Sequence, residues 1–167
     1  GNIFVTFDPW AYSQADVVIV DINLDVQKQS SDEGELLGFD VNLEPFTKAI
    51  EVLAQFCKPE VLILIETTVP PGTCEQVVFP ILQRGFAGRN LPTDLFKLGH
   101  SYERVMPGPN YIDSIESFYR VYSGVNNESA VATEKFLKTI IRTDNYPLTR
   151  LKNTNATEMA KVLENSY

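Results

Sequence analysis

The stretch VLILIETTVPPGTCEQ, residues Val61 to Gln76, decides the fold. It begins with five consecutive aliphatic residues, continues through Glu66, Thr67 and Thr68, and then turns at Pro-Pro-Gly. An aliphatic run without alternation is typical of a strand that is covered on both faces, and such strands belong to parallel sheets flanked by helices. The stretch therefore predicts a buried strand, a polar strand end and a helix.

The polar strand end is a candidate ligand-binding edge. Ligands in open α/β sheets bind outside the carboxyl ends of the strands, so the hydroxyls of Thr67 and Thr68 are candidate contacts beside the positive start of the next helix. Pro71 suits the first turn of that helix, where a backbone N–H is not needed. Threonine is also a common helix cap, and both interpretations fit the residues.

Composition limits the classes of partner. The chain has 167 residues, 44% of them hydrophobic, which suits about one domain with a real core. Its net charge of −8 provides no general attraction for nucleic acid or anionic membranes, so an anionic ligand needs a local basic pocket. The apolar runs are too short to span a bilayer and no secretory pattern is present, which indicates a cytoplasmic location. Two cysteines and one histidine suggest neither a disulfide framework nor a metal site.

The rest of the chain alternates between strand and helix patterns, which predicts an α/β doubly wound parallel sheet. Asp8 and Pro9 mark a helix start, and the polar residues 23–40 and the Gly/Pro/Asn-containing residues 85–92 are expected to be loops. The expected strands cover residues 3–7, 17–22, 61–65, 95–102, 120–124 and 146–149, and the expected helices cover residues 42–57, 71–84, 111–118, 126–141 and 155–167.

The last helical pattern carries a second group of candidate residues. Lys161 and Asn165 are four positions apart and share one side of the helix, opposite an apolar stripe that includes Met159 and Leu163. A solvent-exposed polar face is the ordinary explanation for such a pair. The chain ends within this pattern and opens on an uncapped apolar stretch, as a piece of a longer polypeptide would.

Four motifs in order, ADVVIVDI, LILIETTVPPGT, SYERVMPG and ATEMAKVLENSY, resemble the UDP-glucose/GDP-mannose dehydrogenase family. The resemblance implies a partial Rossmann-like sheet whose first βαβ unit is missing. Residues 1–150 would belong to the NAD-binding domain, and residues 151–167 would start the long linking helix of the central dimerisation region. It also implies a cytoplasmic, homodimeric parent enzyme that uses NAD to oxidise the C6 hydroxymethyl of a nucleotide sugar to a carboxylate, in a four-electron reaction through a cysteine-linked intermediate.

The same resemblance assigns roles to residues. Thr68 corresponds to the threonine that holds the catalytic water near the nicotinamide, with Thr67 beside it. Lys161 corresponds to the lysine that stabilises the oxyanion, and Asn165 to its partner amide, as expected where charge develops on a sugar oxygen. Glu103 matches a glutamate suited to acid/base work or to orienting the water. Arg104 is expected to contact the substrate with it, whereas the ordinary explanation of Glu103 is a surface charge or an ion pair with Arg104.

Some positions depart from the family pattern. Residues 21–25 replace the usual Ala-Val-Pro-Thr-Pro turn, so the cofactor threonine expected there is absent. Tyr102 replaces a proline, and Pro107 stands where UDP-glucose dehydrogenases have a second glutamate. The ERVMPG sequence resembles instead the UDP-N-acetylhexosamine branch, such as UDP-N-acetylmannosamine dehydrogenases.

Two missing features suggest that this chain alone is inactive. The sequence contains no Gly-x-Gly-x-x-Gly motif, and the family's nucleophilic cysteine lies beyond the lysine helix. Cys57 and Cys74 are expected to be small buried residues, and His100 a hydrogen-bonding strand residue. Two alternatives stay open: a relative of the 6-phosphogluconate and 3-hydroxyacid dehydrogenases, which also combine a Rossmann domain with a Lys/Asn helix, and a non-catalytic α/β binding module whose threonines are helix caps.

Overall fold

The computed structural model describes residues 2–24, 26–30, 36–105 and 108–165. The strands are β1 (Val17–Val20), β2 (Val26–Ser30), β3 (Leu36–Val41), β4 (Leu62–Ile65), β5 (Lys97–His100), β6 (Val121–Gly124) and β7 (Thr149–Arg150). The helices are the 3-10 helix η1 (Pro9–Gln14), α1 (Glu44–Phe56), the π-helical turn η2 (Cys74–Val78), α2 (Phe79–Gly88), α3 (Tyr111–Glu116), α4 (Asn127–Leu137) and α5 (Thr154–Glu164).

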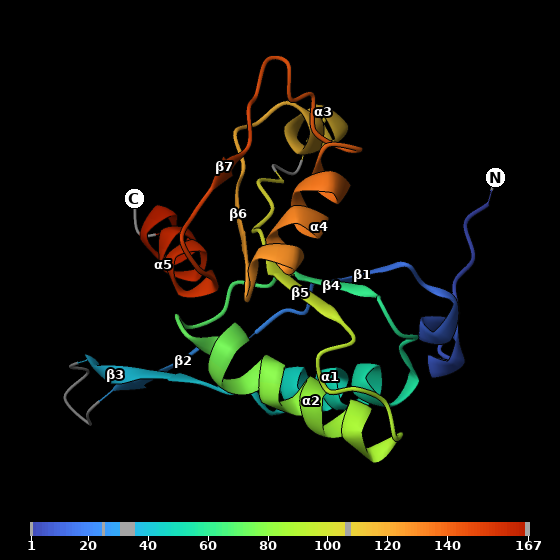
Figure 1. The fold of residues 1–167 in the computed structure, drawn as a ribbon. Helices are drawn as coiled ribbons and strands as arrows, with labels where there is room; N and C mark the ends of the chain where they lie inside the picture. The colour runs from blue at the N-terminus through green and yellow to red at the C-terminus, as the bar shows by residue number, and fades with distance from the viewer. Residues whose placement is uncertain (1, 25, 31–35, 106–107, 166–167) are drawn as a thin grey trace.

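One sheet with the strand order β1-β4-β5-β6-β7 organises the molecule (Figure 1). The predicted parallel pairing is confirmed for β1, β4 and β5, with Val17, Leu62 and Lys97 in register. It is wrong for β6, which runs antiparallel to β5. In the described part of the connection between β5 and β6 the short helix α3 forms, and the residues of β6 themselves do not indicate the direction in which the strand runs.

Helices cover both faces of the buried central strand β4, whose four residues are all buried. In Figure 1, α1 and α2 lie together on one face of the sheet and α4 lies on the other. The predicted apolar stripe of α1 is confirmed, because Phe46, Ile50 and Leu53 are buried. The two helices approach closely at Gly85, where an added Cβ would come within 2.3 Å of the Cβ of Ala54.

Two predictions in the first quarter of the chain are wrong. Residues 3–7 form no strand and Phe4 is 87% exposed, since nothing in the described structure pairs with their backbone. Asp8, by contrast, caps η1 as expected and accepts a hydrogen bond from the Trp10 N–H. The expected loop at residues 23–40 contains the antiparallel hairpin β2–β3, while residues 25 and 31–35 of that loop lie outside the described structure. Cross-strand backbone bonds hold such a hairpin, so its sequence need not show a strong apolar pattern.

The helix after β4 starts later and ends later than predicted. The chain first turns through residues 70–73, with Gly72 at a φ of +94° that favours glycine, so Pro71 precedes the helix instead of starting it. Helix α2 ends at Gly88, within the expected loop at residues 85–92. The close approach to Ala54 explains why the helix keeps a glycine at position 85.

Helix α5 buries its polar side. The buried residues are Thr154, Thr157, Glu158 and Lys161. Met159 and Leu163 of the apolar stripe are 44% and 54% exposed. The ordinary explanation of Lys161 as a solvent-exposed charge is therefore wrong in this structure.

Candidate functional site

A polar recess of about 360 Å³ lies at the carboxyl ends of β1 and β4. This position is the edge of the sheet that the sequence predicts for ligand binding. The recess brings together side chains from the ends of three consecutive strands of the parallel part of the sheet. Its lining residues are Asp21, Ile22, Asn23, Leu24, Glu66, Thr67, Thr68 and Glu103.

The two threonines have different environments. Thr67 is 3% exposed, and its Oγ1 accepts a hydrogen bond from the Ile22 N–H at 2.8 Å and donates one to the Val20 carbonyl at 3.2 Å. Thr68 is exposed and faces the recess. Thr67 therefore joins the ends of β1 and β4 and does not cap the following helix, while the exposed Thr68 lines the recess.

A buried ion pair supports the floor of the recess. Arg120, which is 3% exposed, donates to Glu66 Oε1 at 3.0 Å and to the Tyr102 carbonyl at 2.9 Å. Burial raises the pKa of Glu66, and Arg120 acts in the opposite sense. Arg120 shows in the sequence only as a charge at the start of a strand, because its partner Glu66 lies 54 positions away along the chain and leaves no local pattern.

Lys161 lies against Glu103. It is 9% exposed, and its Nζ donates to the Glu103 carbonyl at 3.2 Å and lies 3.7 Å from Glu103 Oε1. The same Nζ is 5.1 Å from the centre of the Tyr102 ring, a favourable position for a cation. Glu103 thus connects the recess to a nearly buried positive charge.

The remaining predicted site residues lie farther out. Arg104 forms an ion pair with Glu164 and stacks at 5.4 Å over the Phe118 ring, so the expected pairing of Glu103 with Arg104 is replaced by Glu103 with Lys161. Asn165 is exposed at the end of α5, where its N–H donates to the Lys161 carbonyl at 3.0 Å. Neither residue lines the recess. Pro107 lies outside the described residues.

Neither cysteine is a competent nucleophile in this structure. Cys74 is fully buried, and burial together with the neighbouring Glu158 raises its pKa well above the usual range. Burial raises the pKa of Cys57 to about 11. Since the thiolate is the reactive form, both thiols are unreactive near neutral pH, which agrees with their predicted role as small buried residues.

His100 is a buried hydrogen-bonding strand residue, as predicted. Its Nδ1 lies 2.9 Å from Thr157 Oγ1, and burial lowers its pKa to about 4, so the ring is neutral near pH 7. Among the described residues, no group of His, Cys, Asp or Glu is arranged to hold a metal ion.

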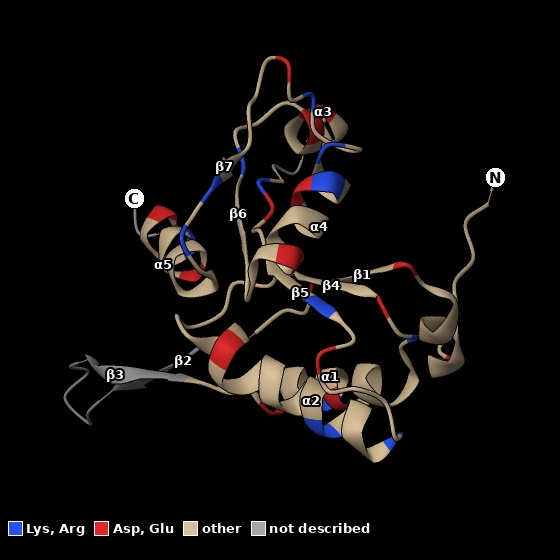
Figure 2. Cartoon of the chain, viewed as in Figure 1, with Lys and Arg blue, Asp and Glu red and all other residues tan. Residues whose placement is uncertain are grey.

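The charges around the recess favour hydroxyl and amide groups of a ligand over phosphate. Asp21, Glu66 and Glu103 supply carboxylates, and no lysine or arginine among the described residues lines the recess. In the view of Figure 2, acidic and basic residues are interspersed along the described elements. No helix within the described ranges has the length and apolar character needed to cross a membrane.

Comparison with known proteins identifies the family of the chain. Residues 1–142 match the NAD binding domain of the UDP-glucose/GDP-mannose dehydrogenase family. The chain is 30% identical over 132 residues to a UDP-N-acetyl-D-mannosamine dehydrogenase of Pyrococcus horikoshii, covering 79% of this chain and 30% of that protein. It is 31% identical over 125 residues to a UDP-N-acetyl-D-glucosamine 6-dehydrogenase of Pseudomonas aeruginosa, covering 75% of this chain and 28% of that protein.

Solved structures share the fold. A UDP-D-ManNAc dehydrogenase from Pyrococcus horikoshii superposes with a TM-score of 0.72 at 24% identity, over 96% of this chain and 34% of that one. The chain therefore spans about 30% of the length of the relatives it matches. With most of its residues matching the NAD-binding domain, the chain belongs to the UDP-glucose/GDP-mannose dehydrogenase family.

Proposed function

We propose that the protein to which this chain belongs is an NAD-dependent UDP-sugar 6-dehydrogenase that converts the C6 hydroxymethyl of a UDP-N-acetylhexosamine to a carboxylate. One observation carries the proposal: Lys161 lies against Glu103, which lines the same recess as Thr68. The relatives named as UDP-N-acetyl-D-mannosamine dehydrogenases support UDP-N-acetylmannosamine as the sugar.

The proposed chemistry follows from these positions. Oxidation of an alcohol places developing negative charge on the sugar oxygen, which the preorganised Lys161 ammonium stabilises in a water-poor site. The Glu103 carboxylate exchanges a proton or orients a water molecule, and the Thr68 hydroxyl holds that water. Arg104 and Asn165 contact the outer part of the substrate, near the end of α5.

The recess suits one part of NAD, the cofactor that accepts the hydride. The Thr68 hydroxyl and the Asp21 carboxylate match the ribose hydroxyls and the carboxamide of the nicotinamide end, while Thr67 supports Thr68 from the strand ends. The pyrophosphate needs a cation or free helix N–H groups. The N–H groups of Gly72 and Cys74 already donate to Glu158, which supports our assignment of the phosphates to other residues of the full-length protein.

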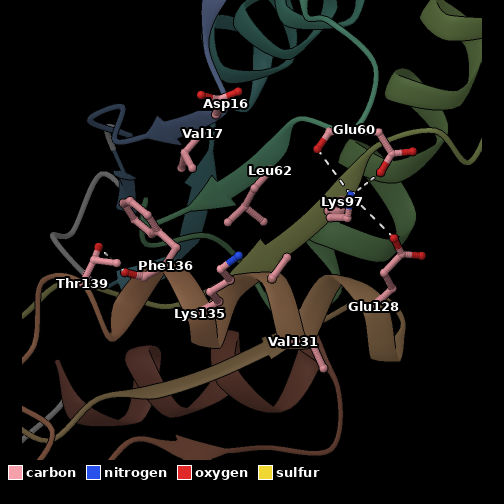
Figure 3. A pocket seen from close by; sticks show the side chains of 11 residues that line it. Asp16, Val17, Glu60, Leu62, Lys97, Glu128, Val131, Lys135, Phe136 and Thr139 are labelled. Atoms are coloured by element: carbon pink, nitrogen blue, oxygen red, sulfur yellow. Dashed lines mark hydrogen bonds and ion pairs between the residues drawn. The ribbon is translucent and has the colours of Figure 1, made fainter.

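The proposal includes a further strand–helix unit beside β1. Strand β1 is an edge strand, and its Ile19 is 46% exposed. Next to it, a hollow of about 510 Å³ opens between the sheet and α4. Figure 3 shows Val17 and Leu62 of the sheet and Phe136 of α4 around this space, with Lys97 paired to acidic residues at one end.

The handedness of the crossovers supports a helix of this further unit in the hollow. The crossovers from β1 to β4 and from β4 to β5 extend the sheet in one direction and place α1 and α2 on the same face. Parallel crossovers are right-handed in nearly all proteins, so a unit that extends the sheet the other way from β1 places its helix on the opposite face. That is the face of α4 and of the hollow. Such a βαβ unit would carry the pyrophosphate-binding turn at its own helix start.

A substrate panel on the full-length protein tests the proposal. NAD reduction is measured with UDP-N-acetylmannosamine, UDP-N-acetylglucosamine, UDP-glucose and GDP-mannose, and with 6-phosphogluconate and a 3-hydroxyacid as controls. We expect turnover with a UDP-N-acetylhexosamine. Turnover with only the two controls supports the hydroxyacid alternative, and no turnover with any compound supports a non-catalytic module.

The exposed Met159 and Leu163 of α5 support a homodimeric parent.

A further inference from the structure

Glu158 is the least expected group on the buried side of α5. It has no solvent exposure, and its two carboxylate oxygens accept hydrogen bonds from the Gly72 N–H at 2.5 Å and the Cys74 N–H at 2.8 Å. We propose that Glu158 is a positioning residue, which fixes α5 and therefore Lys161 relative to the strand end that carries Thr67 and Thr68. This inference rests on the proposed function, because it assigns Lys161 to the reaction.

The partner of Glu158 is the start of the helix that follows β4. The N–H groups at a helix start carry a partial positive charge and normally bind water, a cap or an anion. Here the turn at Gly72, with its positive φ, and the first residue of η2 both direct their N–H groups at one carboxylate. Glu158 thus occupies the place that an anionic ligand takes at many helix starts.

The spacing on α5 connects this contact to Lys161. Residues three apart lie on the same side of a helix, so Glu158 and Lys161 are neighbours on the buried side. Glu158 is bound to the turn that begins two residues after Thr68, and Lys161 is bound to the Glu103 carbonyl. A shift or rotation of α5 would break both contacts together. The pair therefore sets the distance between the Thr68 side of the recess and the Lys161 charge.

Other contacts of α5 are directed elsewhere. Thr157 Oγ1 lies 2.9 Å from His100 Nδ1 and 2.8 Å from Ser123 Oγ, so it fixes the helix to β5 and β6. Thr154 donates to Glu75 at 3.3 Å, at the outer end of the interface. Within the described residues, both hydrogen bonds from Glu158 to the segment after β4 are shorter than the bond between Thr154 and Glu75.

A buried carboxylate suits this role because only an acceptor of two hydrogen bonds satisfies both N–H groups. Burial raises the pKa of Glu158, while the hydrogen bonds from Gly72 and Cys74 lower it. In a Glu158→Gln variant one oxygen becomes an NH₂ group that faces an N–H, so one of the two contacts is lost while size and shape are kept. We expect α5 to shift in that variant without unfolding.

Steady-state kinetics of the full-length enzyme tests the assignment. Glu158→Gln is expected to lower kcat for the UDP sugar at least about tenfold, with KM for sugar and NAD changed less than about threefold. Two controls are matched to it. Glu75→Ala removes the acceptor of the Thr154 hydroxyl in the same interface. Leu137→Ala destabilises the core on α4, away from α5. Both are expected to keep kcat within about twofold of wild type, well below their melting temperatures.

The outcomes separate the two proposals. If the wild type is active and Glu158→Gln keeps the wild-type kcat, the role of Glu158 is overturned and the proposed function stays intact. The same holds if Glu158→Gln lowers kcat no more than Leu137→Ala does. A variant that is folded by circular dichroism and shows the selective loss of kcat supports it. A wild-type enzyme without turnover on any UDP sugar overturns the proposed function and the inference together.

Discussion

Thr67 and Thr68 are adjacent in the sequence, yet the structure gives them separate tasks. Thr67 is buried and bonds to the end of β1, whereas Thr68 is exposed to the recess. The sequence left open whether these hydroxyls serve a ligand or a helix cap. The structure supports a structural role for the first, at the strand ends, and leaves the second hydroxyl available to a ligand.

A matched pair of variants separates these tasks. Thr67→Val keeps the shape but leaves the Ile22 N–H without its acceptor, so we expect the free energy of unfolding to fall by about 1–3 kcal/mol. Thr68→Ala is expected to change that free energy by less than about 0.5 kcal/mol, because the side chain is exposed, and to lower kcat. Urea unfolding and turnover of the full-length protein measure both. Equal effects of the two variants on stability would contradict the assignment.

Lys161 offers the most direct residue-scale test of the chemistry. Lys161→Ala removes the charge proposed to stabilise the oxyanion, so we expect kcat to fall by about 10² or more. Lys152→Ala, at an exposed lysine just before α5, is the control and is expected to keep wild-type turnover. Turnover at the wild-type level in a folded Lys161→Ala protein would remove Lys161 from the site.

The buried His100 imidazole should make the free energy of unfolding depend on pH. Burial lowers its pKa from 6.5 to about 4 in the folded state. Between these values the unfolded chain binds a proton that the folded chain does not, so the free energy of unfolding falls as pH falls from 6.5 to 4, by up to roughly 3 kcal/mol. This is the only histidine in the chain.

The His100→Asn variant isolates that contribution. Its side-chain amide can replace Nδ1 in the contact with Thr157 but does not titrate. Urea unfolding at pH 7, 6 and 5 should show a steeper loss of stability for the wild type than for the variant. Parallel pH profiles would contradict a neutral, buried imidazole.

At the scale of elements, sequence patterns identified the parts of the fold that bury apolar residues. The aliphatic runs of β1 and β4 and the stripe of α1 were predicted correctly, because burial on the sheet requires them. The hairpin β2–β3 was missed, because residues 23–40 are largely polar and show little periodicity in the sequence. The direction of β6 was also missed, because the residues of a strand do not indicate whether it pairs parallel or antiparallel with its neighbour.

Helix α5 shows how a periodic pattern can mislead. Polar residues recur with helical spacing at 154, 157, 158 and 161, and this pattern ordinarily marks a solvent face. In this chain each of them has a partner on another element, so the polar side is buried. The sequence contains no sign of partners that lie dozens of positions away. Glu158 was therefore overlooked, although its neighbour Lys161 was selected.

The open edge of β1 leads to a prediction at this scale. If a further strand–helix unit covers Ile19 in the full-length protein, Ile19→Asp places a charge in an apolar interface, and we expect the free energy of unfolding to fall by about 2–4 kcal/mol or folding to fail. Ile112→Asp on α3, where the side chain is 61% exposed, is the control and should change it by less than about 0.5 kcal/mol. Equal, small effects of both variants would mean that β1 remains an edge.

At the scale of the whole molecule, the chain provides one wall of a site. Its recess is acidic, its net charge is −8, and its one prominent helix start beside the recess is occupied by Glu158. Under the proposed function, this recess receives hydroxyl and amide groups, and other residues of the full-length protein bind the phosphates. The family resemblance implies this division from the missing motifs, and it stays a prediction.

The stoichiometry of NAD reduction tests the central claim most directly. Full-length protein is incubated with a limiting amount of UDP-N-acetylmannosamine and excess NAD, and the NADH formed is compared with the sugar consumed. A four-electron oxidation of C6 to a carboxylate yields two NADH per sugar, and the uronate is identified by mass. One NADH per sugar, with the reaction complete at the two-electron stage, or no NADH with any UDP sugar, would contradict the account.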